Sequence, residues 1–140
     1  MAYDSNNVFC KILRGELPAQ KVYEDAETLA FMDIMPRCEG HMLVVPKTPA
    51  RNVLDASPAQ LAACMRTVQK VAAAAMKAFG AAGITLQQFN EPAGGQVVFH
   101  LHVHVIPRKI GVALKPAASF KEEPAVLAEH AQKIAAALNG

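Results

Sequence analysis

The sequence contains few cysteines, and they are far apart. Its 140 residues include three, Cys10, Cys38 and Cys64. An odd and widely spaced set is a poor disulfide framework. We therefore expect three reduced thiols packed as small hydrophobic groups, as is usual in a reducing compartment.

Long runs of one residue type are also missing. No apolar stretch reaches the roughly 18 residues of a membrane-spanning helix, and the first residues lack the charged start and apolar run of a signal peptide. The 14 Lys and Arg residues are scattered and nearly balanced by 12 Asp and Glu residues, whereas nucleic-acid binding usually needs a basic patch. These absences predict a cytoplasmic protein whose partners include neither a membrane nor a nucleic acid.

What remains is an ordinary globular composition, 52% apolar and 19% charged, without repeats or linkers. A chain of this length buries roughly two-thirds of the surface that its unfolded form exposes. We expect a single domain over residues 1–140, with its core within about 8–108 and a C-terminal extension over 109–140 that contains a helix.

The clearest predicted element is a long central helix. Ser57 can cap its N-terminus, Pro58 suits the first helical position, and Gln60 completes a capping box. Gly80 is expected to end the helix. Apolar residues recur between these signals at helical spacing and are predicted to face the core: Leu61, Met65, Val68, Ala72, Ala75 and Phe79.

Short strands make up much of the remainder. We expect a short helix over 8–14, a last helix from Pro124, and strands over 21–24, 28–32, 41–45, 84–89 and 98–106. Several strands with few helices between them favour an α+β fold with a five-stranded antiparallel sheet over a parallel βαβ array.

The most informative stretch is His100-Leu101-His102-Val103-His104. Alternate side chains of a strand point to opposite faces, so the imidazoles would form one row while the apolar residues face a core. Each imidazole needs partners for its N–H and its lone pair. A purely structural role is therefore hard to satisfy for all of them at once.

Two chemical roles suit such a row. A His-x-His pair on one strand face can bind zinc. Alternatively, the row binds phosphate, because imidazole offers a hydrogen-bond donor, a proton near neutral pH and a nucleophilic nitrogen. Gly94-Gly95 favours phosphate, since glycines let backbone N–H groups approach an anion. The nearby segment offers only Glu91 as a carboxylate for a catalytic zinc site.

The row resembles the signature of the histidine-triad family, in which three histidines alternate with apolar residues. Segments 9–19, 29–34 and 40–47 are similar to further blocks of the family, so the resemblance covers about 8–108. The chain is most similar to bacterial and Hint-like members. Its segment 105–109 also resembles the branch that hydrolyses dinucleoside polyphosphates.

The resemblance implies a role for each matching residue. His102 would attack the α-phosphorus of a nucleotide and form a nucleotidyl-histidine, which water then hydrolyses. The hydrogen bonds around the phosphate would be completed by His100, His104 and His41. Asp33 would hold the ribose hydroxyls. The remaining substrate contacts would come from Asn90 and Gln96 at the phosphate or leaving group and from an apolar purine slot of Phe9, Ile12, Leu17, Phe31 and Ile34.

Two departures from the family pattern bear on the substrate. Val97 follows Gln96 where the family commonly has Ser or Thr, which changes what can protonate a leaving group. Met32 replaces a more polar neighbour of Asp33.

A further departure bears on metal binding. Some bacterial relatives hold a structural zinc with two Cys and two His. Here Asn7 and Pro49 occupy two of those positions, and only Cys10 and His100 remain. A tetrahedral structural site needs four ligands, so we expect no metal and no cofactor.

The function implied is hydrolysis of a nucleoside 5′-phosphoramidate, with a purine nucleotide (an AMP derivative) as ligand. The alternatives are hydrolysis of dinucleoside polyphosphates and, in another class, a nucleotide-sensing module with little turnover. The resemblance also implies a homodimer through the central helix and a sheet edge. Small residues on that helix would permit a partner to approach closely: Ala62, Ala63, Ala73 and Ala74.

Overall fold

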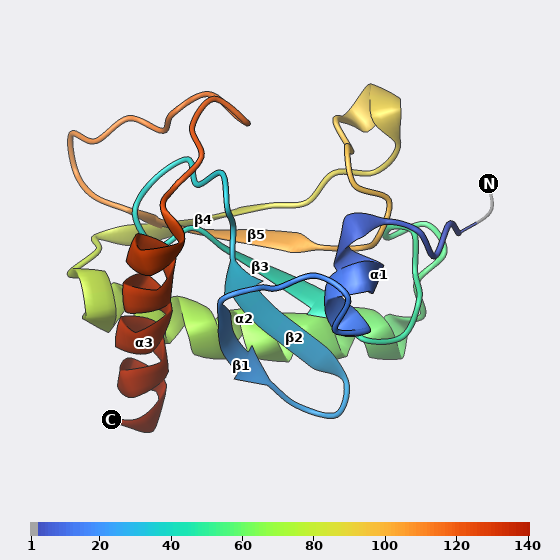
Figure 1. The fold of residues 1–140 in the computed structure, drawn as a ribbon, viewed down its shortest axis with the longest axis horizontal. Helices are drawn as coiled ribbons and strands as arrows, with labels where there is room; N and C mark the ends of the chain where they lie inside the picture. The colour runs from blue at the N-terminus through green and yellow to red at the C-terminus, as the bar shows by residue number, and fades with distance from the viewer. Residues whose placement is uncertain (1–2) are drawn as a thin grey trace.

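The computed structural model describes residues 3–140, and its centre is a five-stranded sheet (Figure 1). Neighbouring strands are all antiparallel, in the order β1-β2-β3-β5-β4. The strands are β1 (Lys21–Glu24), β2 (Thr28–Met32), β3 (Met42–Pro46), β4 (Gly83–Gln87) and β5 (Val103–Arg108). The predicted α+β class and five-stranded antiparallel sheet are confirmed.

Helices cover both faces of this sheet (Figure 1). The long α2 (Pro58–Phe79) lies across one face, the short α1 (Val8–Leu13) lies on the other, and α3 (Pro124–Asn139) packs against α2 and β1. A single 3₁₀ turn, η1 (Pro92–Gly94), interrupts the loop before β5. Within residues 3–140, no helix combines the length and hydropathy that a membrane crossing requires.

Strand alternation divides the core into two layers. Met42 and Val44 of β3 join the large cluster under α2 and α3, whereas Leu43 and Val45 join a smaller cluster with Phe9 of α1. Every residue of β2 and β3 is buried, because both faces of these central strands are covered. The face under α1 is the one that carries the histidines.

The ends of α2 agree with the prediction, but its buried stripe does not. The capping box of Ser57 and Gln60 forms, and Gly80 ends the helix with a φ of 59°. Val68, Ala75 and Phe79 are buried as predicted, together with Ala63, Cys64, Thr67, Val71 and Ala74. Met65 is 48% exposed, and Leu61 and Ala72 are only half-buried. Met65 lines two outer grooves, one together with Leu61 and the other together with Ala72. The helix therefore has an outer apolar surface besides its buried stripe, and the prediction merged the two.

The prediction of a strand over 98–106 is wrong at both ends, because β5 is Val103–Arg108. The ladder with β3 reaches only Val44 opposite Val103, and the N–H of Leu101 bonds instead to the carbonyl of Ala50. Pro107 lies inside the strand. Its missing N–H is tolerated because the β3 register has already ended at Val105, which leaves β4 as the only neighbour there.

The C-terminal extension fastens the loop that follows β2. The backbone N–H of Lys115 donates to the Arg37 carbonyl, and Arg37 Nε donates to the Lys115 carbonyl. The N–H of Glu122 donates to the Ile34 carbonyl. Helix α3 then buries Leu127, Ala131 and Ile134. The extension therefore supports the loop between Asp33 and His41.

Candidate functional site

The site lies on the α1 face of the sheet, where β3 and β5 run side by side. Asp33 follows β2, His41 immediately precedes β3, and His104 is paired with Leu43 in the ladder. His102 precedes β5, and Phe9 of α1 packs edge-on against its ring with the centroids 4.9 Å apart. The rings of His102 and His104 have centroids 5.1 Å apart, so alternation brings these two together as predicted.

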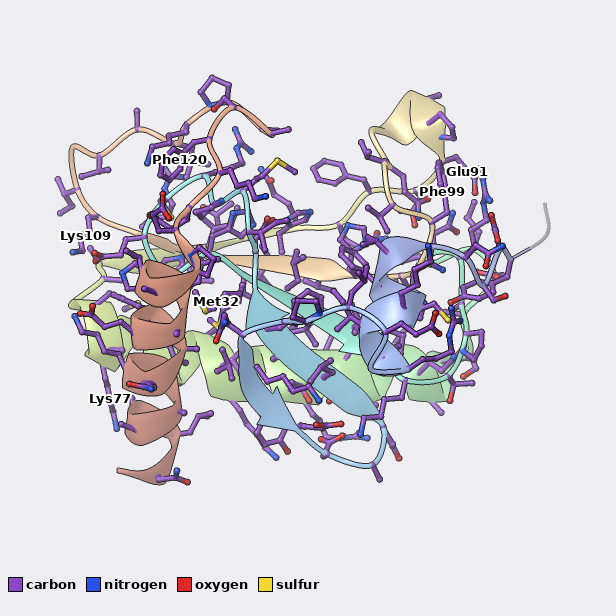
Figure 2. All side chains as sticks on the ribbon, viewed as in Figure 1. Met32, Lys77, Glu91, Phe99, Lys109 and Phe120 are labelled. Atoms are coloured by element: carbon purple, nitrogen blue, oxygen red, sulfur yellow. The ribbon has the colours of Figure 1, made fainter. Side chains whose placement is uncertain are left out.

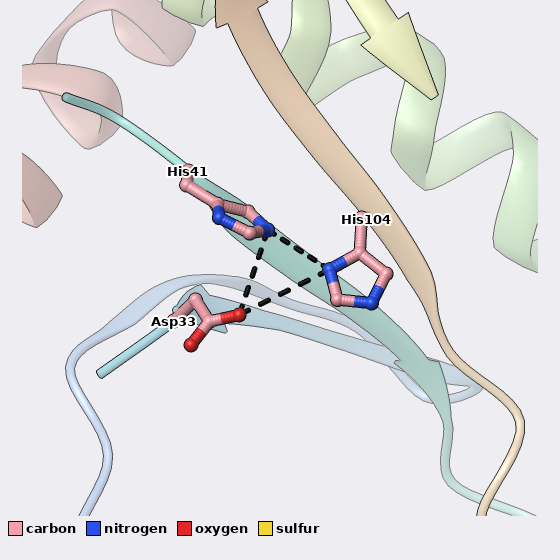
Figure 3. Close-up of side chains that lie close together, drawn as sticks. All are labelled: Asp33, His41 and His104. Carbon is pink, nitrogen blue, oxygen red and sulfur yellow. Dashed lines mark hydrogen bonds and ion pairs between the residues drawn. The ribbon is translucent and has the colours of Figure 1, made fainter. Parts of the chain in front are cut away.

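Hydrogen bonds to His41 set the protonation of two imidazoles (Figure 3). The backbone N–H of Arg37 donates to His41 Nδ1 at 3.0 Å, so in a neutral ring the proton must be on Nε2. His41 Nε2 lies 2.9 Å from His104 Nδ1 and donates to it. The proton of His104 is therefore on its own Nε2, which has no hydrogen-bond acceptor among residues 3–140.

The nucleophile candidate is oriented by a backbone carbonyl. His102 Nδ1 lies 2.7 Å from the carbonyl oxygen of His100, and a carbonyl can only accept, so Nδ1 carries the proton. The lone pair is consequently on Nε2. No group within residues 3–140 is hydrogen-bonded to that nitrogen. Every fully buried side-chain nitrogen in this part of the chain has a partner, so His102 Nε2, which has none, is not fully buried. His102 Nε2 therefore offers a lone pair to an entering molecule.

His100 stands behind the row rather than in it. Its ring is fully buried, with Nε2 2.8 Å from the carbonyl of Pro46 and Nδ1 2.6 Å from the hydroxyl of Tyr3. Since Nε2 must donate to the carbonyl, Nδ1 accepts from the hydroxyl. Both ring nitrogens are thus engaged, and neither is free for a phosphate.

Burial keeps all these imidazoles neutral. It lowers the pKa of His41 to about 4 and that of His104 to about 3, with the nearby Arg37 guanidinium contributing to both shifts. It also lowers the pKa values of His100 and His102 below the ordinary histidine value of 6.5. Desolvation raises the pKa of Asp33 to about 6. At neutral pH the site therefore combines neutral imidazoles with one carboxylate.

Asp33, His41 and His104 offer three potential metal-ligand atoms within 4.8 Å of one another (Figure 3). The Asp33 Oδ2 lies 3.5 Å from His41 Nε2 and 3.9 Å from His104 Nδ1. Yet a metal needs a lone pair, and the N–H of Arg37 fixes His41 with a proton on the nitrogen that faces the cluster. The geometry fits a hydrogen-bond chain rather than a cation.

The structural zinc of some relatives does not fit the residues present either. The Asn7 amide oxygen caps α1 by accepting from the N–H of Cys10, and its Nδ2 donates to the Tyr3 hydroxyl at 3.1 Å. The Tyr3 hydroxyl is also hydrogen-bonded to His100 Nδ1, so that nitrogen is not available as a metal ligand. Pro49 has no ligand atom in its side chain.

The amides of Asn90 and Gln96 hold the loop before β5. Gln96 is only 4% exposed, and its side chain bonds to the Arg51 and Val98 carbonyls, the Asn52 amide and the Glu91 N–H. Asn90 bonds to the Gln88 amide and to the backbone N–H of Val53. In this arrangement both side chains are committed to the loop, and a contact with substrate would have to share or displace these bonds.

One arginine joins the two ends of this loop. Glu91 and Phe99 lie close together at the end of the molecule that also holds α1 (Figure 2). Arg51 forms a 2.8 Å ion pair with Glu91, and its guanidinium lies 4.2 Å from the centre of the Phe99 ring. The guanidinium thereby fixes the loop that leads into the histidine row.

The predicted purine slot is only partly assembled. Phe9, Ile12 and Phe31 belong to one apolar cluster beside His102, together with Leu29, Leu43 and Val45. Leu17 and Ile34 are 38% and 51% exposed and lie outside that cluster. The three clustered residues form a wall next to the nucleophile candidate, and the exposed pair is not part of it.

Sequence reasoning missed the groups that orient the histidines. These are the Tyr3 hydroxyl, the Arg37 N–H and the carbonyls of Pro46 and His100. Three are backbone groups and carry no residue-type signal. Tyr3 could have been suspected, because a buried His100 without a metal needs a partner for each ring nitrogen.

Comparison with known sequences identifies one domain family. A model of the HIT domain matches residues 14–111. "Protein hit" of Bacillus subtilis is 42% identical over 103 residues, which cover 74% of this chain and 71% of that protein. Adenylylsulfatase HINT3 of Arabidopsis thaliana is 42% identical over 102 residues, which cover 73% of this chain but only 52% of that protein.

Solved structures agree over nearly the whole chain. A Hit-like protein involved in cell-cycle regulation from Bartonella henselae has a TM-score of 0.94 at 50% identity, covering 98% of this chain and 99% of that chain. A zinc-bound histidine triad family protein from Mycobacterium smegmatis has a TM-score of 0.85 at 36% identity, covering 96% of this chain and 94% of that chain. The similarity therefore includes α3 and the C-terminal extension.

Proposed function

Because this chain belongs to the histidine-triad (HIT) family, we propose that it is a nucleotide-binding hydrolase that uses His102 as a nucleophile. The preferred substrate class is a purine nucleoside 5′-phosphoramidate. The observation that carries the proposal is the lone pair on His102 Nε2, which has no hydrogen-bond partner among residues 3–140, while Nδ1 is fixed by a carbonyl 2.7 Å away.

The first step transfers the nucleotidyl group. His102 Nε2 attacks the α-phosphorus, an N–P bond forms, and the bond from phosphorus to the amine breaks as the amine leaves with a proton from solvent. The imidazole becomes cationic, and the His100 carbonyl that accepts the Nδ1–H stabilises this charge. Burial lowers the pKa of His102, so the nucleophilic neutral form predominates at neutral pH.

The second step returns the enzyme to its starting state. Water attacks the same phosphorus, the N–P bond to His102 breaks, and AMP and a proton are released. Covalent catalysis of this kind divides one difficult substitution into two easier ones. The adjacent His104 Nε2–H has no acceptor in the described part of the chain. In both steps it would hydrogen-bond an equatorial phosphate oxygen where negative charge accumulates.

His41 and Asp33 have supporting parts in this scheme. His41 donates to His104 Nδ1 and so keeps the proton of His104 directed at the phosphate. Asp33 is partly exposed beside this pair, and a carboxylate there can accept hydrogen bonds from both ribose hydroxyls. Phe9, Ile12 and Phe31 supply apolar surface for the base.

The charge of the loop before β5 favours a phosphoramidate over a dinucleoside polyphosphate. Residues 88–98, expected at the leaving-group side, contain no Lys, Arg or His, and the adjacent Arg51 is paired with Glu91. A polyphosphate leaving group would carry several negative charges without a cation to receive them. An amine leaving group needs none. Val97 is 83% exposed and has no hydroxyl that could donate a proton. The leaving amine would therefore take its proton from solvent.

Turnover separates the candidate functions. Adenosine 5′-phosphoramidate should be hydrolysed faster than diadenosine tetraphosphate, and the reverse order would favour the polyphosphate alternative. Replacing His102 with Ala should lower turnover by roughly three orders of magnitude or more while AMP binding changes little. Rapid quench of the unaltered protein should trap an adenylyl group on His102. Binding without turnover, or an adduct elsewhere, would contradict the proposal.

The proposed assembly is a homodimer formed by the outer stripe of α2 and the edge strand β4. An apolar groove there is lined by Ala62, Met65, Val68, Ala72, Ile84 and Leu86, with Arg66 and Gln69 beside them. Of the four small residues expected at this surface, Ala62 and Ala73 are exposed, whereas Ala63 and Ala74 are buried within the protomer. A second copy related by a twofold axis would cover the groove with its own apolar stripe.

A further inference from the structure

We infer that Tyr3 is a positioning residue of the proposed reaction. Its hydroxyl holds the His100 imidazole, and the backbone carbonyl of His100 holds the Nδ1–H of His102. The inference rests on the proposed role of His102 and goes beyond it, because it assigns a function to a residue that precedes the segment matched by the HIT domain.

The contacts form a continuous chain of three hydrogen bonds around His100. The Tyr3 hydroxyl donates to Nδ1 at 2.6 Å, Nε2 donates to the Pro46 carbonyl at 2.8 Å, and the His100 carbonyl accepts from His102 Nδ1 at 2.7 Å. His100 is 0% exposed. The same residue is therefore held by its side chain and holds the nucleophile by its main chain.

This side-chain clamp matters because the sheet does not fix the backbone here. The β3–β5 ladder begins at Val103, so His100 and His102 lie outside it. The N–H of Leu101 makes the nearest backbone bond, to Ala50. The orientation of the His100 peptide group therefore depends on the Tyr3 and Pro46 contacts as well as on that single bond.

Tyr3 itself is well placed to act as a fixed donor. Asn7 donates to its oxygen at 3.1 Å while capping α1, and the Tyr3 and His100 rings meet edge to face with centroids 5.7 Å apart. Burial raises the pKa of Tyr3 to about 12, so the hydroxyl keeps its proton. Helix α1, which Asn7 caps, also brings Phe9 against His102.

The consequence for catalysis is geometric. An imidazole that attacks phosphorus in line must present Nε2 along one direction, and the bond at Nδ1 sets that direction. Without the Tyr3 donor, a buried Nδ1 of His100 loses its partner, and the ring and its peptide group can reorient to find another. A small displacement of a nucleophile can cost a large factor in rate.

The test compares the two tyrosines of the chain. In Tyr3→Phe, the single-turnover rate of adenylyl transfer from adenosine 5′-phosphoramidate should fall about tenfold or more, as expected for loss of one buried hydrogen bond. The affinity for AMP and the single-turnover amplitude should be nearly unchanged. Tyr23→Phe is the matched control, because the Tyr23 hydroxyl bonds to Asp25 and Lys70 far from the histidines. It should retain the unaltered rate.

Two further measurements exclude a merely structural effect. In ¹⁵N-histidine spectra, Tyr3→Phe should shift the His100 and His102 resonances and leave His130 unchanged. Asn7→Asp keeps a good N-cap for α1 but offers Tyr3 a carboxylate, which draws the hydroxyl proton away from His100. Asn7→Asp should therefore also slow adenylyl transfer, without lowering the melting temperature.

The outcomes separate this inference from the proposed function. If His102→Ala is inactive and Tyr3→Phe transfers the adenylyl group at the unaltered rate, the role of Tyr3 is wrong and that of His102 stands. If Tyr3→Phe lowers the single-turnover amplitude rather than the rate, Tyr3 only stabilises the fold and the inference is wrong. An active His102→Ala variant would overturn the proposed function itself.

Discussion

Residues of one chemical type differ here according to their hydrogen-bond partners. His41 and His100 each accept at Nδ1 and donate at Nε2, whereas His102 donates at Nδ1 to a carbonyl. The sequence motif makes these imidazoles look equivalent. The partner atoms leave a lone pair on His102 and an N–H on His104, which suit the roles of nucleophile and phosphate donor in the proposed reaction, and they leave His41 and His100 as the proposed supports.

Asp33 should make nucleoside binding depend on pH. Burial raises its pKa to about 6, so the carboxylate that would accept from the ribose hydroxyls is lost as the pH falls through that value. Adenosine affinity should weaken about tenfold between pH 7 and pH 5. Calorimetry with adenosine avoids the titration of a phosphate group. Asp33→Asn should bind adenosine weakly at both pH values. If the affinity of that variant still fell about tenfold between pH 7 and pH 5, the role of Asp33 would be contradicted.

Much of the site could be predicted at this scale, and the remainder had no sequence signal. Alternation correctly brings His102 beside His104, and Phe9, one residue of the expected slot, contacts His102, the proposed nucleophile. The withdrawn position of His100 depends on the Pro46 carbonyl, a group that every residue possesses. Motifs report side chains, while backbone acceptors appear only with the fold.

Secondary-structure elements were predictable where local chemistry decides them. The caps of α2 depend on Ser57, Gln60 and Gly80 alone, and they form as expected. The start of β5 depends on how far β3 extends, which is a tertiary property. For the same reason Met65 was assigned to the wrong stripe, since an apolar residue on a helix does not say which of two surfaces it will meet.

The loop before β3 is pressed against α2 at Gly40. Its φ is +87°, and a Cβ atom there would lie 2.7 Å from Cε2 of Phe79. Gly40→Ala should therefore lower the free energy of unfolding by roughly 2–4 kcal/mol, combining backbone strain with overpacking, and should disturb the adjacent His41. Denaturant titration can measure this loss.

Gly15 provides the matched control for that substitution. It also has a positive φ, +78°, but a Cβ there would meet nothing within 4 Å. Gly15→Ala should cost only about 1 kcal/mol, the strain of the backbone alone. Equal losses in the two variants would show that the contact with Phe79 contributes nothing.

At the scale of the whole molecule, the edge strand β4 lies beside an apolar groove. Met65→Glu places a charge in that groove, where the proposed partner would bury it unpaired. The chain of 15.0 kDa should be a dimer by light scattering, and Met65→Glu should be a monomer. Ile110→Glu is the control, because Ile110 is 91% exposed in the C-terminal extension, and it should remain dimeric. A monomeric unaltered chain at micromolar concentration would refute the assembly.

The partner arrangement of the imidazoles also has a consequence for selective labelling. An electrophilic reagent needs an accessible lone pair, and His41, His100 and His104 each use theirs to accept an internal hydrogen bond. Among these rings, and as far as residues 3–140 are concerned, only His102 keeps its lone pair unoccupied. A nucleoside that carries a phosphorylating warhead should therefore tag this protein at one imidazole, despite the density of histidines around it, and could serve as a covalent reporter of the folded site.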